Sequence, residues 1–181
     1  MPAQRDLNPV MSVAQVSAML DEVFPQFNAD RAFEVREIGP GSCTVRLNAG
    51  DNHLRPGGTV SGPSLFALAD IAGYVCVLSH AGPDALSVTT NLNINFMRKA
   101  EAGPIDGHCR ILKLGRSLMV FDIEMIAGDD QHLVAGQVVV ENRLQRGGGP
   151  THLAFVAHAL VGFQIVDQRA DTAHFGAGDN D

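Results

Sequence analysis

The pattern of hydrophobic and polar positions predicts a short helix and two strands at the start of the chain. Residues 10–24 carry apolar side chains at three- and four-residue spacing, which is typical of an amphipathic helix. Two strands are expected at about 32–38 and 42–49, because Gly39-Pro40-Gly41 between them is a turn signal. Apolar and polar residues alternate in the second strand, so its inward positions should be Cys43, Val45 and Leu47.

A nearly continuous apolar segment follows a loop rich in turn-forming residues (52–62). Pro63 suits the first turn of a helix, and Gly82 with Pro83 marks its end. Between these points the segment is apolar on almost every side. This indicates a helix surrounded by protein rather than one lying on a surface.

Four further strands are predicted after this helix, over about 86–98, 104–114, 117–127 and 131–141. Gly128-Asp129-Asp130 is a hairpin signal between the last two. The order is therefore helix, two strands, buried helix, four strands. An α+β fold, in which one long helix is wrapped by a single and mostly antiparallel sheet, satisfies this order.

The composition changes at Gly147-Gly148-Gly149-Pro150, which is typical of a linker. We expect one domain over residues 1–146 and a C-terminal extension of undetermined structure over 147–181. The whole chain of 181 residues is near the usual size of one domain.

Charge and composition argue against several classes of partner. The chain has 13 Lys and Arg against 20 Asp and Glu, a net charge of −7, which is unlike a nucleic-acid or anionic-membrane binder. The longest apolar run, Leu65 to Leu78, is shorter than the roughly 20 residues of a membrane span. The first ten residues lack the apolar core of a signal peptide, so we expect a cytoplasmic protein.

No cofactor or metal site is predicted. The three cysteines, Cys43, Cys76 and Cys109, are far apart in the sequence and form no CxxC pair, and the histidines show no ligand spacing. The chain also has no G-x-S-x-G elbow and no Gly-rich nucleotide-binding loop. His53, in the loop before the buried helix, is expected to be a surface residue.

Asp70 stands out because it lies in the middle of the apolar helix. Burial of an ionised carboxylate is costly unless the group is paired or its pKa rises. One interpretation is an Asp bonded to a nearby hydroxyl, such as that of Tyr74 one turn on. The other is a desolvated general base or nucleophile that faces a cleft.

The loop from Gly58 to Pro63 leads into the helix N-terminus, where unpaired amides and the helix dipole favour negative charge. It could stabilise an oxyanion, or it could be a plain helix entry capped by Ser61. Asp70 lies on the order of 10 Å along the axis from Pro63. If both act on one substrate, we expect them to come from two chains related by a two-fold axis.

The stretch HLRPGGTVSGPSLFALADIAGYV, together with TTNLNINFMRKA and LKLGR downstream, resembles the phenylacetate-degradation-type hotdog thioesterases. Their motif has the form N-P-x-G-x-x-H-G-G, with an acid seven positions after it. The resemblance covers roughly residues 30–141. It implies a hotdog fold, homodimers or homotetramers with sites at the dimer interface, and hydrolysis of acyl-coenzyme A thioesters.

The resemblance also implies roles for individual residues. The helix acid corresponds to Asp70 as general base or nucleophile, and the oxyanion-hole glycine corresponds to Gly62. Thr89 corresponds to a Ser or Thr that orients the water in some members.

Three positions depart from the family motif: Ser61 replaces its histidine, Pro63 its second glycine and Arg55 its asparagine. Proline has no N–H, so one oxyanion donor is missing. Ser61 and Arg55 remain candidates for substrate contacts. The coenzyme phosphates would need a local basic patch, for which the candidates near strand ends are Arg98, Lys99, Lys113 and Arg116. Arg116 is the strongest of these, and ordinary solvated charge is the alternative for each.

Two other functions stay open. The three departures could leave a hotdog protein that binds acyl-CoA without hydrolysing it. A hydroxyacyl thioester dehydratase is a further alternative, although its chemistry usually needs a histidine beside the acid, and the helix has none near Asp70.

Overall fold

The computed structural model describes residues 6–23, 31–83, 86–128 and 132–145. Its helices and strands are α1 (Val13–Val23), β1 (Phe33–Gly39), β2 (Ser42–Ala49), β3 (Leu54–Arg55), β4 (Thr59–Val60), α2 (Gly62–Ala81), β5 (Leu86–Phe96), β6 (Gly103–Leu114), β7 (Leu118–Ala127) and β8 (His132–Gln145). A single 3-10 turn, η2 (Asp51–His53), precedes β3. The two predicted helices and six predicted strands are confirmed.

The predicted connections between the elements have different outcomes: one is corrected by the structure, and the others lie partly or wholly outside the described residues. The segment 52–62, expected to be a loop, contains the short hairpin β3–β4, whose turn places Gly57 and Gly58 at φ of 102° and 76°. Glycine adopts such values without strain. Residues 129–130 of the hairpin signal and the extension 147–181 lie outside the described residues, and the domain boundary at 146 stays a prediction.

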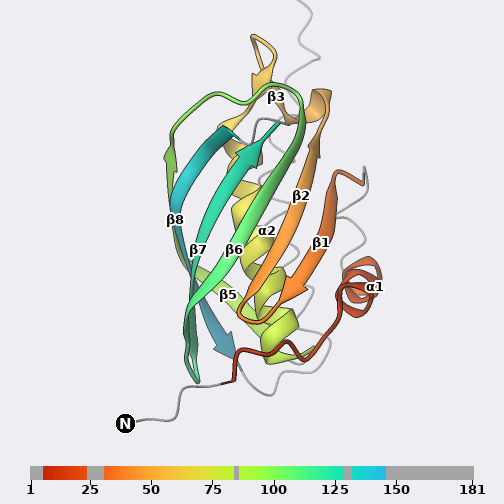
Figure 1. Ribbon diagram of the computed structural model, residues 1–181, viewed down its shortest axis with the longest axis vertical. Helices are drawn as coiled ribbons and strands as arrows, with labels where there is room; N and C mark the ends of the chain where they lie inside the picture. Colours follow the sequence, from red (N-terminus) through yellow and green to blue (C-terminus); the bar gives the residue numbers. More distant parts are fainter. Residues whose placement is uncertain (1–5, 24–30, 84–85, 129–131, 146–181) are drawn as a thin grey trace, which may run out of the picture.

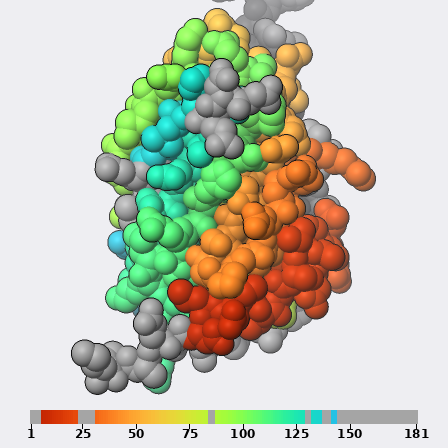
Figure 2. Space-filling model, in the orientation of Figure 1, coloured from red at the N-terminus to blue at the C-terminus, as the bar shows by residue number. Residues whose placement is uncertain are grey.

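Six strands form one antiparallel sheet in the order β1-β2-β6-β7-β8-β5, which curls around α2 (Figure 1). The hairpin β3–β4 lies beside the N-terminus of α2. It is joined to the β5–β6 connection by a hydrogen bond from the Val60 N–H to the Ala100 carbonyl oxygen (2.8 Å). α1 packs against β1 and α2 at the other end of the molecule (Figure 2). A central helix wrapped by an antiparallel sheet is the hotdog arrangement.

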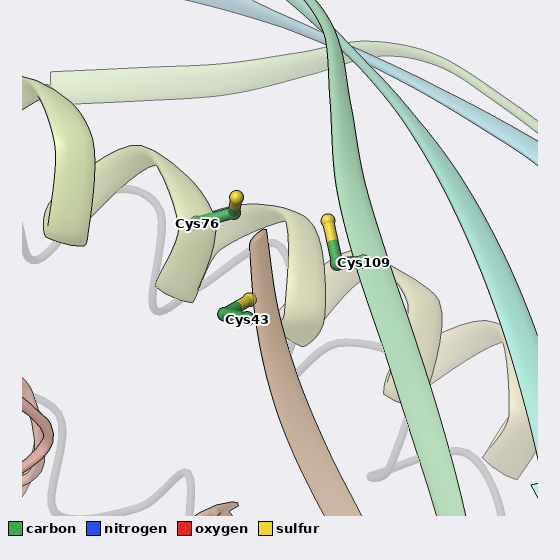
Figure 3. Close-up of side chains that lie close together, drawn as sticks. All are labelled: Cys43, Cys76 and Cys109. Atoms are coloured by element: carbon green, nitrogen blue, oxygen red, sulfur yellow. The ribbon is translucent and has the colours of Figure 1, made fainter. Parts of the chain in front are cut away.

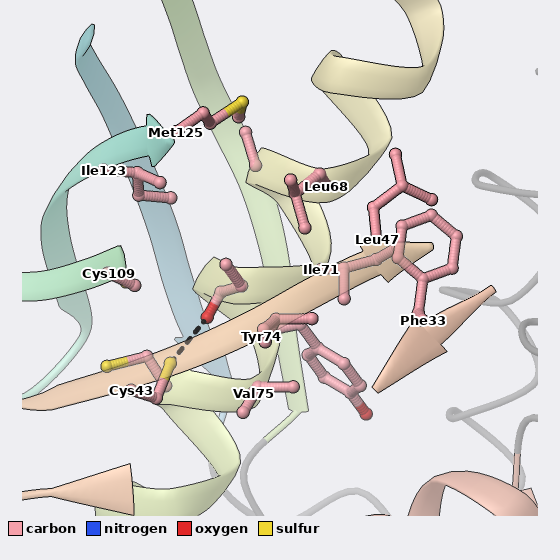
Figure 4. Packing of buried hydrophobic residues seen from close by; sticks show 14 of the residues in the cluster. Phe33, Cys43, Leu47, Leu68, Ile71, Tyr74, Val75, Cys109, Ile123 and Met125 are labelled. Atoms are coloured by element: carbon pink, nitrogen blue, oxygen red, sulfur yellow. Dashed lines mark hydrogen bonds between the residues drawn. The ribbon is translucent and has the colours of Figure 1, made fainter. Parts of the chain in front are cut away.

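The sequence determines where α2 begins and ends. The Ser61 hydroxyl oxygen accepts a hydrogen bond from the Ser64 N–H, so Ser61 is the N-cap, and Pro63 lies in the first turn. Gly82 ends the helix with φ of 94°, which suits glycine. Every residue from Ile71 to His80 is buried, and the core of the sheet closes around this stretch (Figure 4).

With 20 residues, α2 is longer than the apolar run Leu65 to Leu78 and is long and apolar enough to cross a membrane. However, 78% of its most apolar window is buried inside the structure. It is the core helix that the sheet encloses.

Alternation along the strands sets which side chains reach α2. In β2 the inward positions Cys43, Val45 and Leu47 are buried as predicted, and β7 buries alternate side chains, including Phe121, in the same way. β5 differs, because it is an edge strand of the sheet and its register with β8 shifts twice. Val88 and Phe96 on this strand are 42% and 55% exposed.

The three cysteines, distant in sequence, meet in the core (Figure 3). Cys43 and Cys109 are paired across β2 and β6, Cys76 of α2 packs against them, and the three Sγ atoms lie within 4.8 Å of one another. Burial raises the pKa of the Cys109 thiol well above its ordinary value. A closed zinc site needs a fourth ligand. His80 does not supply it, because both of its ring nitrogens face backbone carbonyl oxygens: Nδ1 lies 2.9 Å from that of Cys76 and Nε2 lies 3.2 Å from that of Gly39.

Candidate active site

One stripe of α2 is left partly open by the sheet. Pro63, Phe66, Ala67 and Asp70 follow each other at three- and four-residue spacing and keep partial or full exposure, while Leu68 and its neighbour Ala69 are buried. Asp70 occupies the deep end of this stripe. An acid at the end of an apolar, accessible stripe is placed to meet an apolar substrate.

The carboxylate of Asp70 is held from the edge strand. Thr89 of β5 donates a hydrogen bond through its Oγ1 to Asp70 Oδ1 (2.5 Å). The hydroxyl partner among the described contacts is thus Thr89 rather than Tyr74, so that part of the structural interpretation is wrong. Burial raises the pKa of Asp70 above its ordinary value, and the Thr89 hydroxyl partly offsets this.

Asn142 of β8 lies behind Thr89, and no sequence motif singled it out. It is paired with Thr89 in the β5–β8 ladder and is 1% exposed, and its amide oxygen lies 2.8 Å from Thr89 Oγ1. The one available signal is that Asn142 follows Val138 and Val140 at a period of two, which puts a polar residue on an otherwise apolar strand face.

Gly62 is the first residue of α2, and no described residue accepts a hydrogen bond from its N–H. Phe96 covers this position, since a Cβ on Gly62 would lie 3.5 Å from the Phe96 ring. Asp70 is eight residues further along the helix, about 12 Å at 1.5 Å per residue. The acid and this amide of one chain are therefore too far apart to act on one carbonyl group.

The two other candidates near the helix N-terminus already have partners. The Arg55 Nε donates to Thr59 Oγ1 (2.8 Å) within the β3–β4 hairpin, which leaves the rest of its exposed guanidinium open. The Ser61 N–H donates to the His53 carbonyl oxygen (2.8 Å), and its hydroxyl caps α2. His53 itself is 7% exposed and packs edge-on against Phe33, so its predicted place on the surface is wrong.

The four basic candidates do not gather in one place on a single chain. The strand registers align Phe96 with Gly107 across β8 and β7, whereas Thr89 aligns with Leu114. Arg98 and Lys99 therefore lie at the end of the sheet near α2's N-terminus, and Lys113 and Arg116 lie at the opposite end. Arg98 contacts His132 (3.2 Å), and Lys99 pairs with Glu101 (3.1 Å). One shared basic patch within a chain, as expected from the sequence, is not formed.

These groups define a hydrolytic kind of site. A desolvated carboxylate with a hydroxyl donor can activate water, and an unpaired amide at a helix N-terminus can stabilise negative charge on oxygen. The fold is the hotdog arrangement, and these groups have the chemistry that a thioesterase site requires.

Comparison with known proteins agrees with this class. Residues 57–134 match the family model described as the thioesterase superfamily. A solved structure titled as a putative thioesterase, from Silicibacter sp. TM1040, is 45% identical, covers 76% of this chain and 94% of its own, and superposes with a TM-score of 0.68. The chain therefore belongs to the thioesterase superfamily, and hydrolysis of an ester or thioester is its general activity.

More distant relatives share the fold. A thioesterase from Haemophilus influenzae is 14% identical with a TM-score of 0.64, covering 76% of this chain and 92% of its own. A structure titled as a hypothetical thioesterase with coenzyme A, from Streptococcus pneumoniae, is 18% identical with a TM-score of 0.60, covering 70% of this chain and 97% of its own. Among curated proteins, one named "putative esterase" from Thermoplasma acidophilum is 28% identical over 99 residues, 55% of this chain and 74% of its own.

Proposed function

We propose that the protein is an acyl-CoA thioesterase in which Asp70 is the general base or nucleophile. The observation that carries this proposal is the carboxylate of Asp70, desolvated, bonded to Thr89 and placed on the open stripe of α2. A buried carboxylate with a raised pKa is a stronger base than an exposed one, and perturbed pKa values cluster at functional sites.

As a base, Asp70 takes a proton from a water molecule, and the resulting hydroxide attacks the thioester carbonyl carbon. The oxyanion that forms is stabilised by the N–H of Gly62. When the tetrahedral intermediate collapses, the C–S bond breaks, and the proton held by Asp70 passes to the thiolate of coenzyme A. As a nucleophile, Asp70 would instead attack the carbonyl carbon, and the C–S bond would break as the coenzyme A thiolate leaves. Water would then hydrolyse the acyl-carboxylate anhydride, which releases the acid, regenerates Asp70 and supplies the proton for the thiolate.

The distance of about 12 Å between Asp70 and Gly62 of one chain supports a site shared by two chains. β5 is an edge strand with exposed apolar side chains, including Val88 and Phe96, and such an edge invites pairing. If two β5 strands pair antiparallel about their centres, at Asn91, Thr89 comes opposite the partner's Asn93, three residues from the partner's Phe96. Because Phe96 covers Gly62 in each chain, this pairing would bring Gly62 of the partner subunit toward Asp70.

Coenzyme A as the leaving group is supported by the pneumococcal relative, which was solved with that molecule. In a site shared by two chains, basic residues that lie at opposite ends of one chain would be brought to the same place, some from each chain. An antiparallel dimer brings the partner's Arg98 and the partner's Lys99 to the end where Arg116 lies. The phosphates of the coenzyme would then meet side chains from both chains.

The test is release of free thiol from a panel of acyl-CoAs, measured for the wild type and for Asp70→Asn. We expect turnover on at least one acyl-CoA and a decrease of about 10²-fold or more in the variant, as for loss of a general base. Asp122→Asn on β7 is a matched control that should retain activity. A reaction in H2 18O under single turnover separates the two roles, because only the nucleophilic route leaves label on Asp70.

A non-catalytic acyl-CoA-binding protein is the second candidate. It is favoured by the engagement of Ser61 as a helix cap and by Pro63, which cannot donate a hydrogen bond. Tight binding of acyl-CoA without any thiol release across the panel would support this function and exclude the first.

A further inference from the structure

The hydroxyl of Thr89 has one proton and two oxygen neighbours. Its Oγ1 lies 2.5 Å from Asp70 Oδ1 and 2.8 Å from the amide oxygen of Asn142. A hydroxyl cannot donate its single proton to both of these acceptors at once. One of the two contacts must therefore be a hydrogen bond in the other direction, or no bond at all.

The amide of Asn142 indicates which contact this is. Its Nδ2 is buried and has no hydrogen-bond partner among the described residues, although Asn142 is 1% exposed. An unpaired buried N–H group is expensive, on the order of 1–3 kcal/mol. The oxygen and nitrogen of an asparagine amide are interchangeable by a half-turn about the last side-chain bond. After that half-turn Nδ2 faces Thr89 Oγ1, and the orphaned donor gains an acceptor.

From this arrangement we infer that Asn142 is a positioning residue: its Nδ2 donates to Thr89 Oγ1, which commits the Thr89 proton to Asp70. The Thr89 hydroxyl then accepts from Asn142 and donates to Asp70, which is the final acceptor. The role of these bonds in catalysis rests on the proposed function. The direction of donation, from Asn142 to Thr89 to Asp70, does not depend on it.

The surroundings of Asp70 make the effect easy to detect. Burial and the Thr89 hydroxyl are the two influences on its pKa, so no charged side chain of the described residues masks the effect. The ionisable neighbours on the adjoining elements are Tyr74 on α2, and Glu141 and Arg143 on β8. Burial raises the pKa of Tyr74 to about 12, so it stays neutral while Asp70 titrates.

The test is the titration of the Asp70 carboxyl carbon by 13C NMR in the wild type, Asn142→Leu and Thr89→Val. With Asn142 as donor, Asn142→Leu frees the Thr89 hydroxyl to rotate, so the pKa of Asp70 increases, as it also does in Thr89→Val. If Asn142 instead competed for the Thr89 proton through its oxygen, Asn142→Leu would release that proton to Asp70 and the pKa would decrease. A decrease, or no change, overturns the inference.

Controls separate this role from a loss of packing. Asn48→Leu, the same change at an exposed position of β2, should leave the Asp70 titration unchanged, and Thr89→Ser should keep it close to that of the wild type. If Asn142→Leu does not fold, Asn142→Ala replaces it. Alanine removes the donor without adding a charge, so the pKa of Asp70 should again increase, and an unchanged value contradicts the inference.

The pH dependence of kcat/KM is a second test of the role of Asn142. We expect kcat/KM of Asn142→Leu on the acid limb of its pH profile to fall about three- to tenfold, the range for one hydrogen bond, with a smaller loss at high pH. A merely structural Asn142 would lower activity equally at all pH values. Because the NMR titration requires no turnover, it remains decisive even if acyl-CoA hydrolysis is not found.

Discussion

Asp70 is a residue at which stability and activity oppose each other. The partly buried carboxylate ionises less readily in the folded chain than in the unfolded chain, so ionisation favours unfolding. At neutral pH the wild type therefore carries a cost that a neutral side chain of the same shape would not. This cost is what makes the group a better base.

We predict that Asp70→Asn is more stable than the wild type at pH 7–8, by about 1 kcal/mol or roughly 2–4 °C in Tm. The sign follows from the raised pKa. Below the ordinary pKa of an aspartate both states are protonated and the variants should be equally stable. The difference grows as pH rises toward the raised pKa and is constant above it. Thermal unfolding of both proteins across this pH range checks the prediction, and a variant that is less stable at neutral pH would contradict it.

The same residue shows how far sequence reasoning extends at this scale. Asp70 was singled out because one charge interrupts an apolar helix, whereas Gly62 was assigned only through the resemblance to the family motif. Asn142 was not, because its partner Thr89 is 53 residues away and only the β5–β8 register joins them. The cysteine cluster was missed for the same reason: sequence spacing does not report which side chains a helix and two strands bring together.

At the scale of elements, the β2–β6 pair carries the best-defined polar contact on the sheet. Arg46 and Asp106 are directly opposite each other, and the guanidinium binds the carboxylate through two hydrogen bonds, of 2.7 and 2.6 Å. The Arg46 guanidinium holds the pKa of Asp106 below its ordinary value. Two-pronged pairs of this kind are stronger than ordinary surface ion pairs.

We predict that Asp106→Asn lowers the stability at pH 7 by about 1 kcal/mol, since an amide keeps one acceptor but not the charge. A lowered pKa stabilises the folded chain above the ordinary pKa of an aspartate, and this contribution is lost as pH falls through the lowered value. The difference between wild type and variant should therefore vanish in acid, opposite to a loss caused by packing. Urea unfolding at pH 7 and at pH 3 measures it, with Arg46→Gln as the partner for a double-mutant cycle.

Strand periodicity predicted these elements well, and it failed where a strand lies at an edge. β2 and β7 each have a neighbouring strand on both sides and α2 beneath them. Their alternating apolar side chains are therefore buried. β5 has a neighbour on one side, and its apolar side chains remain exposed in a single chain. The basic residues were likewise misplaced, because nearness to a strand end does not say which end of the sheet that is.

At the scale of the whole molecule, the exposed edge and the divided site have one explanation. If one complete site needs Asp70 of one chain and Gly62 of another, then assembly is a condition for catalysis. If the whole site instead lay within one chain, catalysis would not require assembly. A mixture of two inactive variants distinguishes the two arrangements, because it can regain activity only if the site is shared between chains.

We predict that mixing Asp70→Asn with Gly62→Pro restores activity that neither variant has alone. Gly62→Pro removes the N–H, and proline is favoured in the first helical turn, so α2 should still form. In a mixed dimer one site has both changes and the other has neither. If the chains exchange at random, half of the dimers are mixed and each holds one intact site of two, so about a quarter of the wild-type activity should return.

Gly62→Ala is the control for this experiment, because it keeps the N–H and its Cβ would meet the Phe96 ring at an ordinary contact distance of 3.5 Å. It should retain most of the activity. Thiol release is measured after the two inactive variants are unfolded together and refolded, beside the same mixture of proteins refolded separately. Activity confined to the co-refolded sample means that each chain supplies the part of the site that the other lacks. Activity that stays absent, with dimers of both variants verified by their mass in solution, means that Asp70 and Gly62 do not act on the same substrate from different chains.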